Sequence, residues 1–153
     1  MSSETTTAAG TATRTTALKG GVLAGLLGGV AMGVMLTTQM NPVISKAIPA
    51  MYGLSGIAAG WVVHLFHALV LGVVFAAIAS SLNIDSTAKS VGLGVGFGLL
   101  TWAVLAVLVM PIWLGAVGFP NAPDVPNVSS KSFVGHVVYG LVLGVVFPYV
   151  ETL

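Results

Sequence analysis

Four long stretches of this sequence contain no charged residue, and this feature limits most strongly what the chain can fold into. The stretches without Asp, Glu, Lys or Arg are residues 20–45, 47–84, 90–123 and 132–150. A helix needs about 20 apolar residues to cross the roughly 30 Å of hydrocarbon in a bilayer, and each stretch contains such a run. The predicted membrane spans are 20–40, 57–82, 91–113 and 132–150.

The composition agrees with a membrane protein and excludes an ordinary soluble domain. Only 6% of the residues are charged, against roughly 25% in soluble domains, while 56% are hydrophobic. So few charges cannot cover a water-facing surface. We therefore expect an all-α membrane domain over residues 17–153. The Thr-rich residues 1–16 lack apolar periodicity and are expected to form a disordered tail.

Charge and residue usage also limit the functional classes. A net charge of +1 gives no reason to expect a nucleic-acid partner, and the lipid bilayer is the expected surrounding. The absence of cysteine removes thiolate nucleophiles and cysteine-bound metal clusters. The sequence contains no phosphate-binding loop, and the predicted spans contain no carboxylate pair that could act in catalysis. We therefore expect a protein that is not an enzyme.

The orientation follows from the basic residues, which accumulate on the cytoplasmic side of membrane proteins. Arg14, Lys19 and Lys89 fall on one predicted side, whereas Lys46 and Lys131 fall on the other. Three against two predicts that both termini lie in the cytoplasm of a protein in the plasma membrane.

An internal repeat is the clearest sign of organisation. Residues 64–75 read HLFHALVLGVVF and residues 136–147 read HVVYGLVLGVVF, with eight of twelve positions identical. Gly25 and Pro42 likewise precede Gly94 and Pro111 by 69 residues, and both prolines are expected to break the outer ends of their spans. The chain thus reads as a duplicated helical hairpin. The repeat units are residues 20–82 and 90–150, in the same orientation, so the predicted four-helix bundle has a pseudo-twofold axis along the membrane normal.

Glycines recur every four residues along single helix faces, in the pattern of a glycine zipper. In lipid, helices associate largely through close backbone packing, which small residues permit. The predicted packing glycines are Gly21, Gly25, Gly29, Gly33, Gly72, Gly94, Gly98 and Gly144. The same stripes could contact a second copy, so we expect a homo-oligomer or a subunit of a larger membrane complex.

Two repeated histidines are the candidate binding residues. His64 and His136 each belong to a small-residue stripe, and the pseudo-symmetry would place them across a central axis from each other. Such a pair could ligate haem b through both imidazoles. Copper is the other candidate, with His67 adding an imidazole and Met40 and Met110 adding thioethers.

Less specialised roles compete with cofactor binding. A neutral histidine within a bundle can simply hydrogen-bond to a hydroxyl or a backbone carbonyl of another helix. A small homo-oligomeric transporter or channel is a further alternative, because repeats and helix breaks near polar groups occur in transporters. The favoured expectation is a non-enzymatic structural or accessory membrane protein, with electron transfer or cofactor delivery as the sharper alternative.

The histidine-containing repeat and the two proline-terminated spans resemble small four-helix prokaryotic membrane proteins of uncharacterised families. The resemblance covers residues 20–150 and implies the four-span fold. It implies no activity and no assigned site.

Overall fold

The computed structural model describes residues 2–82, 84 and 86–153, with side chains described from residue 15 onward, apart from residues 83 and 85. Four helices are long and apolar enough to cross a membrane, and their apolar parts are Thr15–Gln39, Ile57–Ser81, Thr87–Ala116 and Ser130–Val150. The shortest has 21 residues, enough to span the hydrocarbon. The chain is a multi-pass membrane protein with an all-helical fold. The disordered tail predicted at 1–16 falls almost wholly outside the fully described residues.

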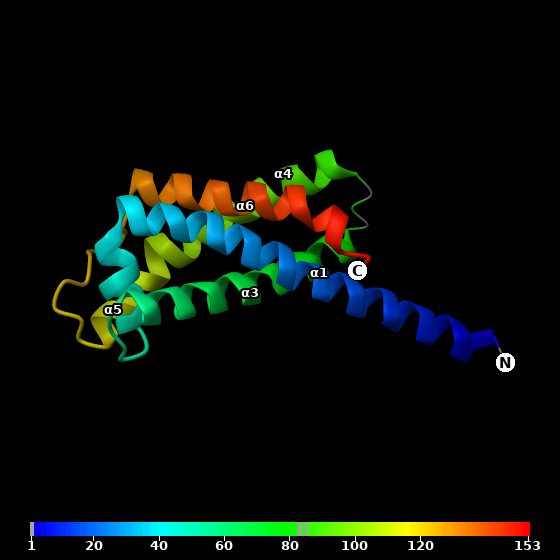
Figure 1. The fold of residues 1–153 in the computed structure, drawn as a ribbon, viewed down its shortest axis with the longest axis horizontal. Coiled ribbons are helices and arrows are strands. Elements are labelled where there is room, and N and C mark those ends of the chain that lie inside the picture. The colour runs from blue at the N-terminus through cyan, green and yellow to red at the C-terminus, as the bar shows by residue number, and fades with distance from the viewer. Residues whose placement is uncertain (1, 83, 85) are drawn as a thin grey trace.

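The helical elements follow one another along the chain with short connections, except for the longer loop of residues 117–129 between α5 and α6 (Figure 1). Two segments, η1 and η2, are π-helical, with wider turns than an α-helix. The elements are α1 (Ser2–Gln39), η1 (Val43–Ala47), α2 (Ile48–Ala50), α3 (Ile57–Ser81), α4 (Thr87–Thr101), η2 (Trp102–Val109), α5 (Met110–Ala116) and α6 (Ser130–Val150).

The first connection is more ordered than the sequence suggests. The chain does turn at Pro42, as predicted, because α1 ends at Gln39 and Pro42 caps η1. Residues 43–50 are helical, however, whereas a loop was expected. Ile44 is fully buried, and its carbonyl lies so close to Gly60 of α3 that a Cβ there would collide with it. Backbone contact with α3 holds this segment against the protein.

The prediction that Pro111 ends the third span is wrong. The helix continues through α4, η2 and α5 to Ala116, so the span covers 30 residues where 91–113 was expected. Pro111 has no N–H to bond the carbonyl of Val107 one turn earlier, and that carbonyl accepts instead from the backbone N–H of Asn127, at 2.9 Å. The wider turns of η2 come immediately before it and give the proline ring room.

The helices pack in an order that leaves one side open. α1 lies between α3 and α6, and α4 packs along α6 (Figure 1). α3 and α4 touch only a little, near the end of the protein where residues 82–86 join them. A gap therefore separates α3 from η2 and α5 toward the opposite end.

The predicted packing glycines all lie where a side chain would collide with another helix. Gly21 and Gly25 face the backbone of Gly72 and Ala68, while Gly94 and Gly98 face Gly140 and its neighbours on α6. Gly33 instead faces the ring of Trp61. Without these side chains, the backbones of α1 and α3, and of α4 and α6, approach closely enough for direct contact.

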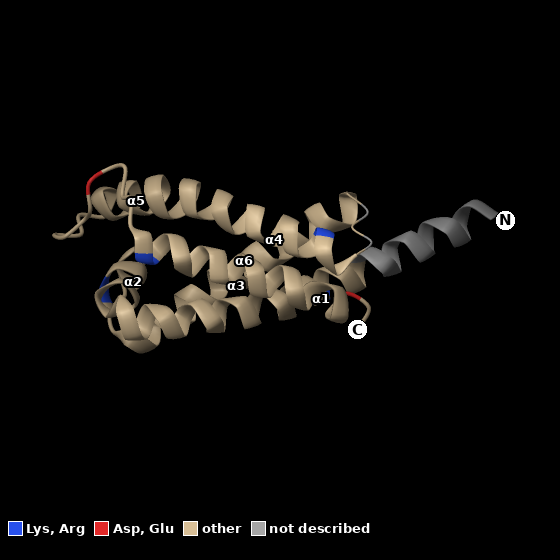
Figure 2. Ribbon diagram, turned by 90° about the horizontal axis from the view of Figure 1, so that it is seen from above, with Lys and Arg blue, Asp and Glu red and all other residues tan. Residues whose placement is uncertain are grey.

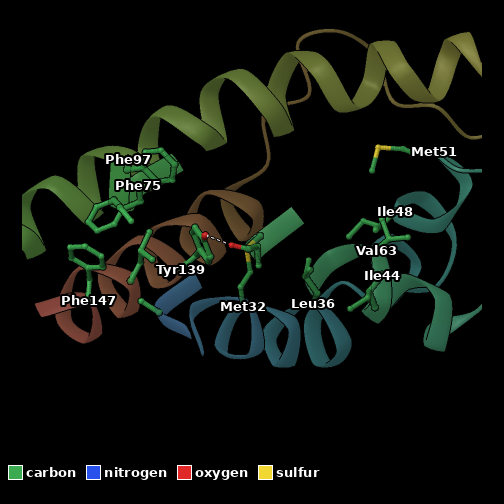
Figure 3. Close-up of a cluster of buried hydrophobic side chains, with 14 of the residues drawn as sticks. Met32, Leu36, Ile44, Ile48, Met51, Val63, Phe75, Phe97, Tyr139 and Phe147 are labelled. Atoms are coloured by element: carbon green, nitrogen blue, oxygen red, sulfur yellow. Dashed lines mark hydrogen bonds between the residues drawn. The ribbon is translucent and has the colours of Figure 1, made fainter. Parts of the chain in front are cut away.

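Three phenylalanine rings join α3, α4 and α6 where these helices converge (Figure 3). Phe75 is fully buried and meets Phe97 and Phe147 edge to face, with ring centroids 5.7 and 5.4 Å apart. Figure 2 shows the charged residues near the two ends of the helices, and the ribbon between these ends carries none in this view. The exposed surface along the middle includes large apolar residues such as Val62 and Leu100. Such a surface suits contact with lipid tails.

Candidate functional site

A cavity of about 460 Å³ lies in the gap between α3 and the η2–α5 segment. Residues of α1 and α6 form its back wall, including Leu36 and Tyr139. The site exists because α4 follows α6 closely while η2 and α5 have little contact with α3. The π-helical turns of η2 contribute Leu105 and Ala106 to its wall.

The two ends of the cavity are covered by protein. At one end, the connection after α1 contributes Ile48 and Met51, and the ring of Tyr52 contacts that of Trp113 at 5.3 Å. Toward the other end, Leu71 lines the cavity, and Phe75 of the aromatic cluster lies one helical turn beyond it. Access along the helix axes is therefore restricted.

The open side of the cavity faces the surroundings of the helices. Phe66 and Val70 of α3 line the cavity and are exposed at the outer surface. The same holds for Leu105 and Val109 of η2. Because these residues belong to membrane-length helices, we expect the opening to lie at the level of the lipid tails. A molecule dissolved in the bilayer could enter between the two helices.

His64 forms a hydrogen bond between helices from the cavity wall. Its Nε2 lies 2.8 Å from the carbonyl oxygen of Gly29 on α1. A carbonyl only accepts, so Nε2 carries the proton and Nδ1 keeps a lone pair. The ring is buried and also meets Trp61 edge to face at 6.2 Å. His64 thus joins α3 to α1 in the way expected of a packing histidine, while one nitrogen is unused.

His136 is held by its own helix. Its Nδ1 lies 2.8 Å from the carbonyl oxygen of Ser132, one turn earlier on α6, so Nδ1 donates the bond. The lone pair of His136 is therefore on Nε2. His64 and His136 are repeat-related but use opposite ring nitrogens, and both line the cavity.

A tyrosine–histidine pair lies beside them. The hydroxyl of Tyr52 and the Nε2 of His67 are 2.7 Å apart, and both residues line the cavity. Tyr139, which occupies the position of His67 in the second repeat, donates from its hydroxyl to the carbonyl of Ala68 at 2.9 Å, as the dashed line in Figure 3 shows. Tyr139 thereby ties α6 to α3 across the back wall.

All five residues proposed from the sequence as cofactor ligands line this one cavity: His64, His67, His136, Met40 and Met110. The described residues contain no group of three or more His, Asp or Glu side chains arranged around a common metal position. The hydroxyls of Thr37, Thr38 and Thr101 bond back to carbonyls of their own helices and not to a histidine.

Comparison with known proteins gives the chain a family. A model of a family of unknown function, DUF6789, matches residues 15–153. The chain belongs to this family. No curated protein and no solved structure matches the chain. The matched region of the family includes all four spans and every residue of the cavity.

Some of the cavity could not be foreseen from the sequence. Tyr52 lies between two predicted spans and was not among the candidate binding residues, but it pairs with His67. Met32 and Met51 also line the cavity, and nothing in their sequence context distinguishes them from packing methionines. The only available signal for Tyr139 was its position opposite His67 in the repeat alignment.

Proposed function

We propose that this protein is a non-enzymatic membrane protein that binds a small, membrane-soluble molecule in the histidine-lined cavity. The observation that carries the proposal is the side opening between α3 and η2, which lies within the membrane-length part of these helices. Soluble ligands would reach a site through water. Here both ends are covered by protein, and the open side is bordered by exposed apolar residues such as Phe66 and Leu105.

The size and chemistry of the cavity support this use. Sites for small molecules typically enclose about 300–1,000 Å³, with mostly apolar walls and a few polar groups that fix orientation. The cavity has about 460 Å³, apolar walls from six elements (α1, η1, α2, α3, η2 and α5) and polar groups from three histidines, two tyrosines and one serine. A ligand with a polar head and an apolar tail would suit both features.

Photolabelling tests the proposal directly. The probe is a hexadecyl chain that carries a diazirine, incorporated into nanodiscs with the purified protein. Tyr139 is 2% exposed and lines the cavity, so its labelling reports entry, whereas the exposed Val62 reports ordinary lipid contact. We expect both positions to be labelled. The variant Ala106→Phe fills the cavity from η2 and should lose labelling near Tyr139 only; labelling restricted to lipid-facing positions in the wild type would refute the proposal.

A cofactor is the second candidate, and a specific observation favours it. Histidines that bind metals almost always donate their other ring N–H to a carboxylate, a carbonyl or water. His64 and His136 both donate to backbone carbonyls and leave one nitrogen for a ligand. Haem b or copper could therefore bind, with His67, Met40 and Met110 as further copper donors. The test is the absorption spectrum and copper content of the purified protein, with His64→Ala and His136→Ala as the variants that should lose both.

We also propose that the fold is a four-helix bundle of two repeated hairpins related by a pseudo-twofold axis. Equivalent close approaches support the repeat. A Cβ added at Gly25 would lie 2.8 Å from Cα of Gly72, and one added at Gly94 would lie 2.8 Å from Cα of Gly144. These pairs correspond in the repeat alignment. The symmetry would be broken where α3 separates from η2, which is the position of the cavity.

For the cellular arrangement we propose the plasma membrane, with both termini in the cytoplasm. Its support is the distribution of basic residues along the sequence: Arg14, Lys19 and Lys89 fall on the side of the termini, and Lys46 and Lys131 fall on the other side. Self-association stays a prediction. Its sequence argument loses strength because the eight predicted packing glycines are occupied by contacts within the chain.

A further inference from the structure

The hydrogen bonds of His64 and His136 fix which ring nitrogens can meet a ligand. Gly29 and Ser132 offer carbonyl oxygens, which cannot donate, so each histidine must place its proton on the nitrogen that faces the carbonyl. A second proton would charge the ring within an apolar cavity, which is costly without a counter-charge. In the neutral form, Nδ1 of His64 and Nε2 of His136 are therefore acceptors.

Both acceptor nitrogens are open to the cavity. Neither bonds to any described residue. Among the described side chains, the polar atoms that are both buried and without a hydrogen-bond partner are Ser90 Oγ and Trp102 Nε1. The two histidine nitrogens have no partner and are not among these atoms, so they are accessible. Since both residues line the cavity, their free nitrogens can accept bonds from a molecule in it. An occupant without a donor would leave them desolvated and unpaired.

The two tyrosine hydroxyls of the cavity do not compete for these nitrogens. Tyr139 donates its proton to the carbonyl of Ala68, and Tyr52 is paired with His67. A ligand must therefore donate hydrogen bonds to satisfy the free nitrogens of His64 and His136. A ketone, an ether or an ester, which only accepts, does not meet this demand.

The walls indicate the shape of the donor. Four methionines line the cavity, namely Met32, Met40, Met51 and Met110. Thioether sulfur makes favourable contacts with aromatic rings, and the flexible side chain adapts to a flat group. The side opening past Phe66 and Leu105 would let an apolar tail extend into the lipid.

We propose that the cavity selects membrane-soluble phenols, including hydroquinones with an apolar tail, and that the ring hydroxyls donate to His64 Nδ1 and His136 Nε2. This inference rests on the proposed function, because it names the ligand class of the same cavity. It predicts discrimination between a hydroquinone and the corresponding quinone, which have the same shape but differ in the two hydroxyl hydrogens.

Competition against the photoactivatable hexadecyl probe measures that discrimination. Decyl-substituted benzoquinone and its hydroquinone are added, under anaerobic conditions, to nanodiscs that contain the full-length protein. The readout is the concentration that halves labelling at Tyr139, with labelling at Val62 as the internal control for quenching. We expect the hydroquinone to be effective at about a hundredfold lower concentration, because the quinone loses two hydrogen bonds and each acceptor left unpaired costs about a factor of ten.

His136→Phe is the decisive variant, because His136 bonds only to its own helix and its removal leaves the contacts between helices in place. It should reduce the preference for the hydroquinone to about a tenth of the wild-type value, because only the bond to His64 Nδ1 remains, while the control Leu100→Ala, on an exposed position of α4, should keep the full preference. Equal competition by both forms in the wild type would overturn the ligand class and leave the proposed function standing. If the hexadecyl probe does not label Tyr139 at all, both the proposed function and the proposed ligand class fail.

Discussion

Replacing Gly94 with alanine should destabilise the protein through the contact between α4 and α6. A Cβ at this position would lie 2.8 Å from Cα and 2.9 Å from the backbone nitrogen of Gly144, and closer still to the carbonyl oxygen of Gly140. Ordinary contact for a Cβ begins near 3.4 Å. Because the opposing atoms are all backbone, no side chain can rotate away, and the helices themselves must move apart.

The magnitude follows from a matched pair on the same helix. Gly96 lies two residues away, is exposed, and has no atom within 4 Å of an added Cβ. Both substitutions gain the same intrinsic helix propensity, about 1 kcal/mol for Gly→Ala. Their difference therefore isolates the packing term, for which overpacking of a well-packed site costs about 1–3 kcal/mol. We expect Gly94→Ala to be less stable than Gly96→Ala by this amount.

The assay is reversible unfolding in mixed micelles with increasing sodium dodecyl sulfate, followed by helical circular dichroism and tryptophan fluorescence. The two variants and the wild type are compared at equal protein and detergent concentrations. Equal unfolding free energies for Gly94→Ala and Gly96→Ala would refute the reasoning, because they would mean that α4 and α6 do not approach each other through this glycine.

Three further predictions concern the core, the back wall and the topology. Phe75→Ala removes a fully buried ring with two edge-to-face partners and should lower the unfolding free energy by about 3–5 kcal/mol in the same assay. Tyr139→Phe removes the bond to the carbonyl of Ala68 and should cost about 1 kcal/mol, with unchanged helix content; a loss beyond about 3 kcal/mol would mean that the hydroxyl does more than bridge two helices. The chain has no cysteine, so single cysteines report topology: Asp124→Cys should react with a membrane-impermeant maleimide in intact cells, and Leu82→Cys only after permeabilisation. The reverse pattern would place the termini outside.

The sequence predicted the spans well because lipid imposes a simple requirement. Backbone polar groups cannot remain unpaired in hydrocarbon, so an uncharged apolar run of about 20 residues forms a helix. The second predicted span, 57–82, differs from α3 (Ile57–Ser81) by one residue. The error came at Pro111, because the effect of a proline depends on the turn that precedes it. The wider turns of η2 are a tertiary feature with no sequence signature.

The candidate site was predicted in part. Periodicity placed His64 and His136 on stripes of small residues that face other helices, because the spacing of a helix fixes which residues share a face. Periodicity could not show which ring nitrogen carries the proton, since the acceptor of His64 is the carbonyl of Gly29, 35 residues away on another helix. Nor could it bring Tyr52 to His67, because that contact requires the chain after α1 to fold back against α3.

The sequence by itself determined that this chain has four membrane-length apolar stretches, where its small residues permit close helix contact, and which polar side chains lie within those stretches. These properties depend on local composition and helix period. Only the tertiary structure decided that α3 and η2 separate, since that depends on how backbones pack across distant parts of the chain. The cavity, its opening toward lipid and the free nitrogens of its histidines all follow from that separation.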